Sequence, residues 1–166
     1  MNDKLPAVIN GRNCYMGSAG PVLALIAFYA AFNDRDLMAM ERNWWTADET
    51  VVMANPLGGL RRGWPDIREV YARIFTGEAT VYVEFYDYTL HESGDIFYAV
   101  GRERGHLERD GQRIELAIRT SRVFRKHDGR WRQIHHHGSI EDPTLLDRYQ
   151  KAVREEASGT AEGQAA

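Results

Sequence analysis

Two arginines interrupt apolar faces of segments that alternate like β-strands. Every second residue from Ile114 to Phe124 falls on one face, mostly apolar, and Arg122 lies on it. Arg102 follows Val100 on a similar face. A guanidinium group there must find an anion or lie at the wet mouth of a cavity. Paired guanidinium groups suit a carboxylate, so a bound anion is one partner that would satisfy both arginines.

Carboxylates inside the same segments offer an alternative to that cavity. An acidic side chain on a neighbouring strand could pair with either arginine and leave no free charge for a ligand. Glu103 shares its face with Phe97 and Ala99, so it is also the first candidate for a general base if the protein is an enzyme. The acidic residues well inside the long alternating segments are Glu84, Glu103 and Glu115.

Three consecutive histidines invite a metal interpretation. Strand alternation turns His135 and His137 to one face and His136 to the other. A zinc site needs at least a third protein ligand, and no further histidine falls at a matching position. We therefore predict no metal. Without a bulge in the strand, His136 faces the cavity, where its pKa near neutrality suits proton transfer or hydrogen bonding.

Aromatic residues are expected to form the rest of the pocket. Tyr29 lies on the apolar face of a predicted helix, where its hydroxyl could donate a hydrogen bond to a ligand or simply belong to the core. The residues expected to line the apolar part of the cavity are Trp44, Trp45, Trp64 and Met53. Such walls suit a flat or aromatic portion of a ligand.

Composition limits the classes of function. The chain of 166 residues has a formal charge of −3, so it lacks the excess of basic residues that is typical of nucleic-acid-binding proteins. A single cysteine, Cys14, permits no internal disulfide. No apolar run approaches the ~20 residues of a membrane span, and the first residues do not resemble a signal peptide. We expect a cytoplasmic protein that binds neither membranes nor nucleic acid and needs no cofactor.

Hydrophobic periodicity changes from helical to alternating near Gly77. An α+β domain is predicted, with helices on one face of a curved antiparallel meander and a homodimer covering the other face. We divide the chain into an N-terminal extension (1–19), a single domain (20–156) and a disordered tail (157–166). Helices are expected at about 21–32, 36–45, 63–76 and 143–155, a short strand at 50–53, and long strands at 79–91, 95–107, 112–126 and 130–140.

Several runs resemble a known superfamily. Residues 29–36 resemble the first-helix signature of ketosteroid isomerase-like and SnoaL-like proteins, and residues 55–59 followed by 62–64 continue that pattern. Residues 120–139 are similar to the end of the calcium/calmodulin-dependent protein kinase II association domain. The resemblance covers roughly residues 20–142. It implies the cone-shaped roll of the nuclear transport factor 2-like superfamily, also called cystatin-like.

The resemblance assigns roles to individual residues. Tyr29 matches a tyrosine that donates a hydrogen bond to a substrate oxyanion. Asn55 stands where ketosteroid isomerases have their general-base aspartate, and an amide cannot exchange a proton near neutral pH. Arg102 and Arg122 match two arginines of the carboxylate-binding pocket of association domains. The third arginine of that pocket is replaced in this chain by Gly138. His135 and His137 belong to a structural signature with Trp131.

Three functions remain open from the sequence. The first is a SnoaL-like dimer that binds a small organic molecule, a carboxylate being one option, in its cone. The second is a cofactor-independent isomerase, cyclase or dehydratase with Tyr29, His136 or Glu103 as catalytic candidates. The third is an oligomerisation scaffold. The ligand-binding residues we predict are Tyr29, Trp44, Met53, Asn55, Trp64, Arg102, Arg122 and His136.

Overall fold

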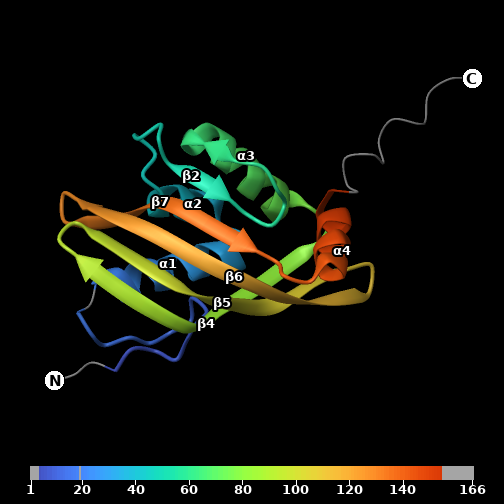
Figure 1. The fold of residues 1–166 in the computed structure, drawn as a ribbon, viewed down its shortest axis with the longest axis horizontal. Helices are drawn as coiled ribbons and strands as arrows, with labels where there is room; N and C mark the ends of the chain where they lie inside the picture. Colours follow the sequence, from blue (N-terminus) through green and yellow to red (C-terminus); the bar gives the residue numbers. More distant parts are fainter. Residues whose placement is uncertain (1–3, 19, 155–166) are drawn as a thin grey trace, which may run out of the picture.

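A computed structural model describes residues 4–18 and 20–154 of the chain. Four helices and seven strands occur among these residues (Figure 1). The elements are β1 (Val8–Ile9), α1 (Gly20–Asn33), α2 (Leu37–Asn43), β2 (Val52–Ala54), β3 (Arg61–Arg62), α3 (Gly63–Thr76), β4 (Thr80–Ser93), β5 (Ile96–Arg109), β6 (Gln112–His127), β7 (Arg130–Ser139) and α4 (Pro143–Arg154). The predicted tail at 157–166 lies outside the described residues.

The four long strands form the predicted antiparallel meander. Strand order in the curved, unclosed sheet is β1-β4-β5-β6-β7-β2-β3. The turns after β5 and β6 each place an aspartate and a glycine at positive φ, Asp110 with Gly111 and Asp128 with Gly129. Two successive residues with positive φ match the right-handed twist of the strands that they join. The α+β class is therefore confirmed.

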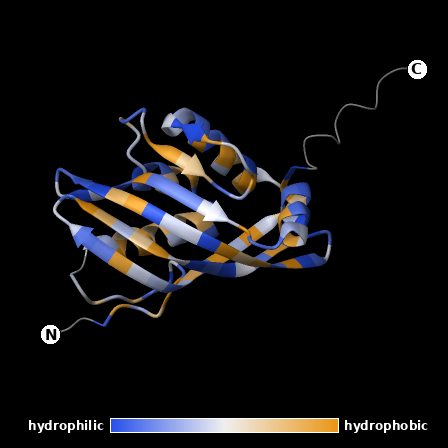
Figure 2. Cartoon of the chain, viewed as in Figure 1, coloured by the Kyte–Doolittle hydropathy of each residue, from blue (hydrophilic) through white to orange (hydrophobic). Residues whose placement is uncertain are grey.

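The helices and the sheet enclose one core. In Figure 1, α1 and α2 lie behind the long strands, α3 lies beside β2, and α4 crosses one end of the sheet. Apolar and polar bands alternate along β4, β5 and β6 in Figure 2, as expected when one sheet face is buried. Phe85, Phe97 and Phe124 on the inner face are fully buried.

Of the short strands at the edges of the sheet, β2 was expected at about 50–53, whereas the two-residue strands β1 and β3 were not predicted. β1 pairs with β4 in the segment predicted as an extension, with Val8 opposite Tyr86. β2 pairs in parallel with β7, with Val52 opposite His135, and antiparallel with β3. Strands of two residues carry too little periodicity to be recognised in a sequence.

No helix in the described part of the chain is both long and apolar enough to cross a membrane.

Candidate ligand-binding site

Arg122 lies at the centre of a polar cluster sealed inside the cone. Each nitrogen of its guanidinium group has an acceptor: Nη2 donates to Glu103 Oε1 (2.9 Å), Nη1 to Gln133 Oε1 (2.8 Å), and Nε to the Tyr29 hydroxyl (3.3 Å). The guanidinium carbon also lies 3.5 Å from the centre of the Phe28 ring. The side chains of Arg122 and Glu103 are only 3% and 6% exposed, so the ion pair is almost completely removed from water.

Tyr29 completes the cluster by donating its hydroxyl hydrogen to Glu103 Oε1 at 2.6 Å. Burial raises the pKa of Tyr29 well above its usual value, and although Arg122 opposes this, the phenol stays protonated. Burial by itself would lower the pKa of Arg122, but the surrounding Tyr29 and Glu103 raise it overall, so the arginine stays charged. The ion pair that the sequence offered as an alternative to a ligand, Arg122 with Glu103, is the arrangement found.

His136 lies beside this cluster, opposite Arg122, and a bulge in β7 brings Gln133 to the same side. Val123 pairs with His135 but Phe124 pairs with Gln133, so Ile134 is an extra residue. Both His136 and Gln133 therefore face inward, and they are 5% and 0% exposed. Burial and then the charge of Arg122 hold the pKa of His136 well below its usual range, so the ring is neutral.

Three polar atoms of the cluster and the cavity wall lack a hydrogen-bond partner among the described residues. They are Nδ1 of His136, Nε2 of Gln133 and the hydroxyl oxygen of Tyr71. Unsatisfied buried polar atoms are uncommon in folded proteins and call for an explanation such as a bound water or ligand. His136 and Tyr71 line a cavity, so an occupant of that cavity can contact both side chains.

The cavity itself is small. Its volume is about 40 Å³, which holds no more than a few water molecules, whereas small-molecule sites usually measure about 300–1,000 Å³. Glu103, Arg122 and His136 form its polar part. The other lining residues are Phe28, Phe32, Met53, Asn55, Pro56, Tyr71, Ile74, Val81, Val83, Ile118 and Tyr149.

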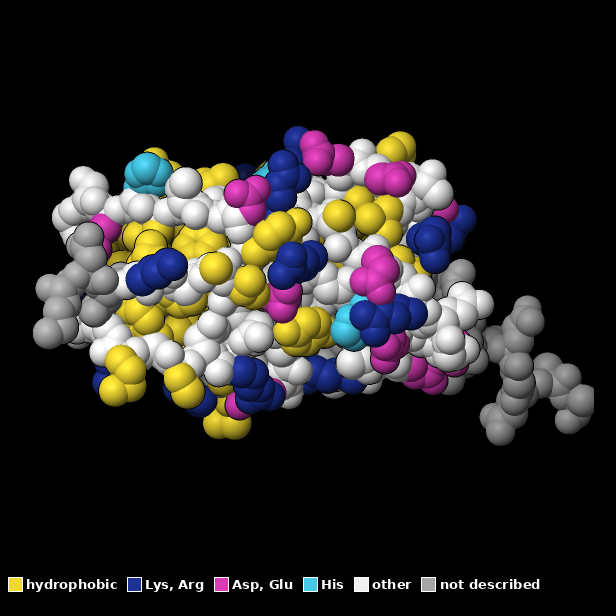
Figure 3. Space-filling view, turned by 90° about the horizontal axis from the view of Figure 1, so that it is seen from below, with side chains coloured by type: hydrophobic (Ala, Val, Ile, Leu, Met, Phe, Trp, Pro, Cys, Tyr) yellow, Lys and Arg dark blue, Asp and Glu magenta, His cyan; other side chains and the backbone are white. Residues whose placement is uncertain are grey.

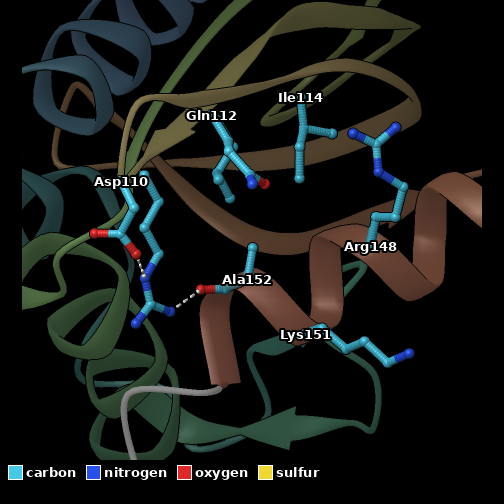
Figure 4. Close-up of a pocket in the computed structure, with 8 residues that line it drawn as sticks. Asp110, Gln112, Ile114, Arg148, Lys151 and Ala152 are labelled. Atoms are coloured by element: carbon cyan, nitrogen blue, oxygen red, sulfur yellow. Dashed lines mark hydrogen bonds and ion pairs between the residues drawn. The ribbon is translucent and has the colours of Figure 1, made fainter.

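Helix α4 closes one side of this cavity through Tyr149. Burial raises the pKa of Tyr149, which is 4% exposed. Gln150 donates to the carbonyl of Pro56 at 2.9 Å, and Arg109 donates to the carbonyl of Ala152 at 3.0 Å. The second of these bonds is drawn in Figure 4, in a separate hollow of about 380 Å³ between α4 and the end of the β5–β6 hairpin.

The structure does not bring Arg102 to the cluster. Arg102 lies opposite Arg119 on the outer face of the sheet, and its Nε is 3.3 Å from Asp87. Arg122 lies opposite Ala99 on the inner face. Both faces of β5 carry apolar residues, so the sequence pattern did not reveal which of them is inside.

The remaining predicted pocket residues divide into two groups. Met53 and Asn55 line the cavity, and the Asn55 side chain accepts a hydrogen bond from the backbone N–H of Leu57 at 3.1 Å. Trp44 and Trp64 are 1% and 7% exposed but do not line it. Both are core residues.

Sequence reasoning missed three polar residues at the site. Gln133 was missed because a bulge turns its side chain inward, and no feature of the sequence indicates that bulge. Tyr71 and Tyr149 were recognised only as members of apolar helix faces, because a buried tyrosine and a pocket tyrosine give the same pattern. Burial raises the pKa of Tyr71 to about 12, so this phenol is also protonated.

Gly138 stands at the position of the third arginine of the association-domain pocket, and its surroundings leave little room for a side chain. A Cβ atom there would lie 3.2 Å from His136 Nε2 and 3.2 Å from Pro56 Cδ. A longer side chain would have to displace the imidazole or the loop. His136 and an arginine at this position therefore compete for the same space.

Within residues 4–18 and 20–154, no three His, Cys, Asp or Glu side chains are arranged to hold a metal ion. His135 pairs with Val52 and His137 with Ala54 across β2 and β7, on the opposite side of the sheet from the cavity.

Comparison with known proteins agrees with this fold. The SnoaL-like domain family model matches residues 22–143, and the chain belongs to this family. F-box protein SKIP8 of Arabidopsis thaliana is 25% identical over 146 residues, which is 87% of this chain and 59% of that protein. The chain thus spans well under two thirds of the curated relative that it matches.

Solved structures share the fold. A protein of the NTF2-like family from Streptomyces avermitilis, assigned as a dehydratase, has a TM-score of 0.64 and 24% identity, covering 72% of this chain and 92% of that one. An assigned calcium/calmodulin-dependent protein kinase type II association domain from Thiobacillus denitrificans has a TM-score of 0.59 and 25% identity, covering 74% and 95%. A ketosteroid isomerase-like protein from Erwinia carotovora has a TM-score of 0.62 and 22% identity, covering 75% and 96%. The nuclear transport factor 2-like, cystatin-like fold is confirmed.

Proposed function

We propose that this SnoaL-like protein binds a small, uncharged organic molecule inside its cone, with His136 as the principal polar contact. The supporting observation is that a neutral, buried histidine presents an unpaired ring nitrogen beside a cavity that is otherwise largely apolar. One ring nitrogen of a neutral imidazole donates and the other accepts, so a carbonyl or hydroxyl group suits it.

The ion pair makes an uncharged ligand preferable to a carboxylate. All three nitrogens of Arg122 are already used by Glu103, Tyr29 and Gln133. A second carboxylate next to Glu103 would raise the pKa of one of the two acids, because two like charges in a buried site oppose each other. A neutral ligand avoids this electrostatic cost. The cavity must nevertheless widen to admit it, and Tyr149 on α4 is one wall that can move.

A thermal-shift series on one ring tests this proposal. Cyclohexanone and cyclohexanecarboxamide are compared with cyclohexanecarboxylate at matched concentrations. A ligand at about 100 times its dissociation constant adds roughly 2.7 kcal/mol of apparent stability, enough to raise Tm by several degrees. We expect shifts with the neutral compounds alone. Shifts with the acid alone would overturn the preference for a neutral ligand, and no shift with any compound would overturn binding in the cone.

Two variants identify the site of binding. His136→Gln should abolish most of the ligand-induced shift, measured against the Tm of the variant itself, because the imidazole contact is lost. His137→Gln changes the neighbouring residue on the opposite, exposed side of the strand and should leave the shift intact. Equal shifts in both variants would place the ligand elsewhere.

A proton-transfer enzyme is the second candidate. It is favoured by the presence of a carboxylate, Glu103, and a neutral imidazole, His136, in one cavity from which water is largely excluded. The structural likeness to an assigned dehydratase and a ketosteroid isomerase-like protein adds support by analogy of fold. Asn55, at the position of the isomerase base, would take no part in proton transfer.

Exchange of carbon-bound protons tests the enzymatic alternative. The protein is incubated with cyclohexanone in deuterium oxide, and the loss of the α-proton signals is followed by NMR. An enzyme of this type should exchange them faster than buffer does, and Glu103→Gln should remove the acceleration while His137→Gln retains it. Exchange at the buffer rate in the wild-type protein would overturn this alternative.

Assembly into a homodimer is part of the same proposal. The likeness to association domains, including that of C. elegans, supports oligomerisation of this fold. Tyr98 and Val100 are 43% and 46% exposed on the outer face of the sheet. Figure 3 shows apolar side chains reaching the surface among basic and acidic groups on the face seen from below. A second copy of the chain would bury such side chains.

A further inference from the structure

A second hollow lies outside the cone. It has a volume of about 740 Å³, within the range of small-molecule sites. The start of α1, the end of α2 with the loop that follows it, and the turn between β6 and β7 form its walls. None of its lining residues also lines the cone cavity, so its properties do not depend on the function proposed above.

Two half-buried tryptophans give this hollow flat apolar surfaces. The Trp45 ring is stacked on His127, with centroids 5.1 Å apart and planes 25° from parallel. The Trp45 backbone is also fixed by donating to the carbonyl of Gln133 at 3.0 Å. The Trp131 ring packs edge-on against Phe97, with centroids 4.9 Å apart. Both rings are therefore held in place before any ligand arrives, which lowers the entropic cost of binding.

The hollow also gathers arginines that lack a carboxylate partner. Arg42, Arg130 and Arg132 line it, and among the described residues none of them has an acidic side chain within ion-pair distance. Its carboxylates, Glu41 and Asp128, are outnumbered by these arginines. Asp128 lies instead beside His127, 3.2 Å from its Nε2.

Arg132 is the most telling of these residues. It is half-buried and lies directly opposite Arg125 across the β6–β7 pair. Like charges directly opposite each other in a sheet are destabilising. Arg125 is compensated by Asp95, whose carboxylate is 3.3 Å away, and its guanidinium lies over the Trp45 ring. Arg132 has no such compensation. A bound anion would supply it.

We propose that this hollow is a binding site for a flat aromatic anion, a ring that carries a carboxylate or a phosphate group. The ring packs against Trp45, and the oxyanion meets Arg132 and Arg130, which lie on the same face of the β6–β7 pair as the His127 ring that Trp45 stacks on. Planar guanidinium groups bind either oxyanion through two parallel hydrogen bonds. Neither an anion without a ring nor a ring without a charge uses both halves of the site.

Indole N–H resonances provide a readout at the site itself. The ¹⁵N-labelled protein is titrated with benzoate, phenyl phosphate, benzamide and inorganic phosphate, and the resonances are assigned with Trp→Phe variants. Benzoate or phenyl phosphate should shift the Trp45 signal with saturation, while the signal of Trp64, which is 7% exposed on α3, stays in place. Benzamide and inorganic phosphate should bind at least about tenfold more weakly.

A matched pair of arginine variants completes the test. Arg132→Gln should raise the Kd of the aromatic anion about tenfold, which corresponds to about 1.4 kcal/mol. Its Tm should not fall, because the substitution removes an uncompensated charge. Arg68→Gln, at an exposed position on α3, should leave the Kd unchanged. Unaltered affinity in Arg132→Gln, equal affinity for benzamide or inorganic phosphate, or no saturable shift with either aromatic anion would each overturn the proposal.

Discussion

Arg122 keeps its charge in the core because its neighbours compensate for the lost water. Glu103 supplies the opposite charge, while Tyr29 and Gln133 supply further hydrogen bonds. Such a pair contributes little to stability by itself, because both ions must be desolvated, but removing one partner leaves a buried charge unpaired. The cluster therefore constrains what can enter the cone: an occupant must leave the balance of charge unchanged.

Glu103→Gln should be strongly destabilising. The amide can still accept hydrogen bonds from Tyr29 and Arg122, but the charge of the guanidinium is no longer balanced. We expect the free energy of unfolding to fall by about 3–5 kcal/mol, measured by urea denaturation.

The control for this prediction is Glu84→Gln. Glu84 forms an ion pair with Arg104 at 2.6 Å on the outer face of the sheet, where Arg104 is half exposed. Loss of this ion pair should lower the free energy of unfolding by less than about 1 kcal/mol. Equal effects of the two substitutions would show that the inner pair is also well hydrated.

His136 should make the protein less stable in acid. Its pKa in the folded state is held well below the usual value of about 6.5 by burial and by Arg122. Below pH 6.5 the unfolded chain therefore binds a proton that the folded protein does not, and the free energy of unfolding falls as the pH falls. The slope can reach about 1.4 kcal/mol per pH unit for one proton. Above pH 7 the effect vanishes, because both states are neutral.

Urea denaturation at pH 5 and pH 7 measures this contribution. His136→Gln should be less sensitive to the change of pH than the wild-type protein is, whereas His137→Gln should behave like the wild type. The same pH dependence in the wild type and in His136→Gln would show that this histidine binds a proton as readily in the folded protein as in the unfolded chain.

Among the elements, β7 and the N-terminal segment do most to shape the site. The bulge at Ile134 turns Gln133 and His136 to the same side, so that one strand contributes two polar groups to the cluster. β1 and the turn after it lie against α1, the helix that carries Tyr29. A hydrogen bond from Asn33 to the carbonyl of Asn10 (3.0 Å) fastens this contact.

Gly11→Ala tests the contact between the N-terminal segment and α1. A Cβ atom at this position would lie 2.3 Å from the backbone nitrogen of Ala30, and φ is +87°. We expect a loss of about 2 kcal/mol or more in the free energy of unfolding, from strain and steric overlap together.

Gly94→Ala separates strain from overlap. Gly94 also has a positive φ, +62°, but a Cβ atom there would meet no atom within 4 Å. Its substitution should cost only about 1 kcal/mol, the cost of an unfavourable backbone conformation. An equal cost at Gly11 would mean that the N-terminal segment does not pack tightly against Ala30.

At the scale of the whole molecule, the sheet has two very different faces. The inner face packs against the helices and holds the polar cluster. The outer face carries ion pairs such as Arg102 with Asp87, together with the exposed Tyr98 and Val100. A mixed surface of this kind is typical of interfaces between folded subunits, which combine apolar and polar contacts.

Val100→Glu should disrupt the proposed homodimer. A carboxylate on the outer face would be desolvated by the second copy, which opposes association. Light scattering should find a dimer for the wild type and a monomer for Val100→Glu. Leu23→Glu, at a residue of α1 that is 45% exposed, should remain dimeric. A monomeric wild type would contradict the proposal, and a ring larger than a dimer would favour the scaffold function.

Local sequence determined the elements and their order. Asp36 caps α2 by accepting from the backbone N–H of Ala39, and Asp-Gly pairs close two of the long hairpins, so the meander follows from short-range chemistry. These features depend on residues close together in the chain, whose preferences a sequence displays directly.

Only the tertiary structure decided the partner of Arg122, the outward position of Arg102 and the inward position of Gln133. Each depends on which sheet face is covered or on a bulge, and a shift of one residue moves every side chain to the opposite face. The parallel pairing of β2 with β7 brings together segments far apart in the chain. The closure of the cone by Tyr149 and the tryptophan-lined hollow likewise arise from packing between distant elements, which no local pattern encodes.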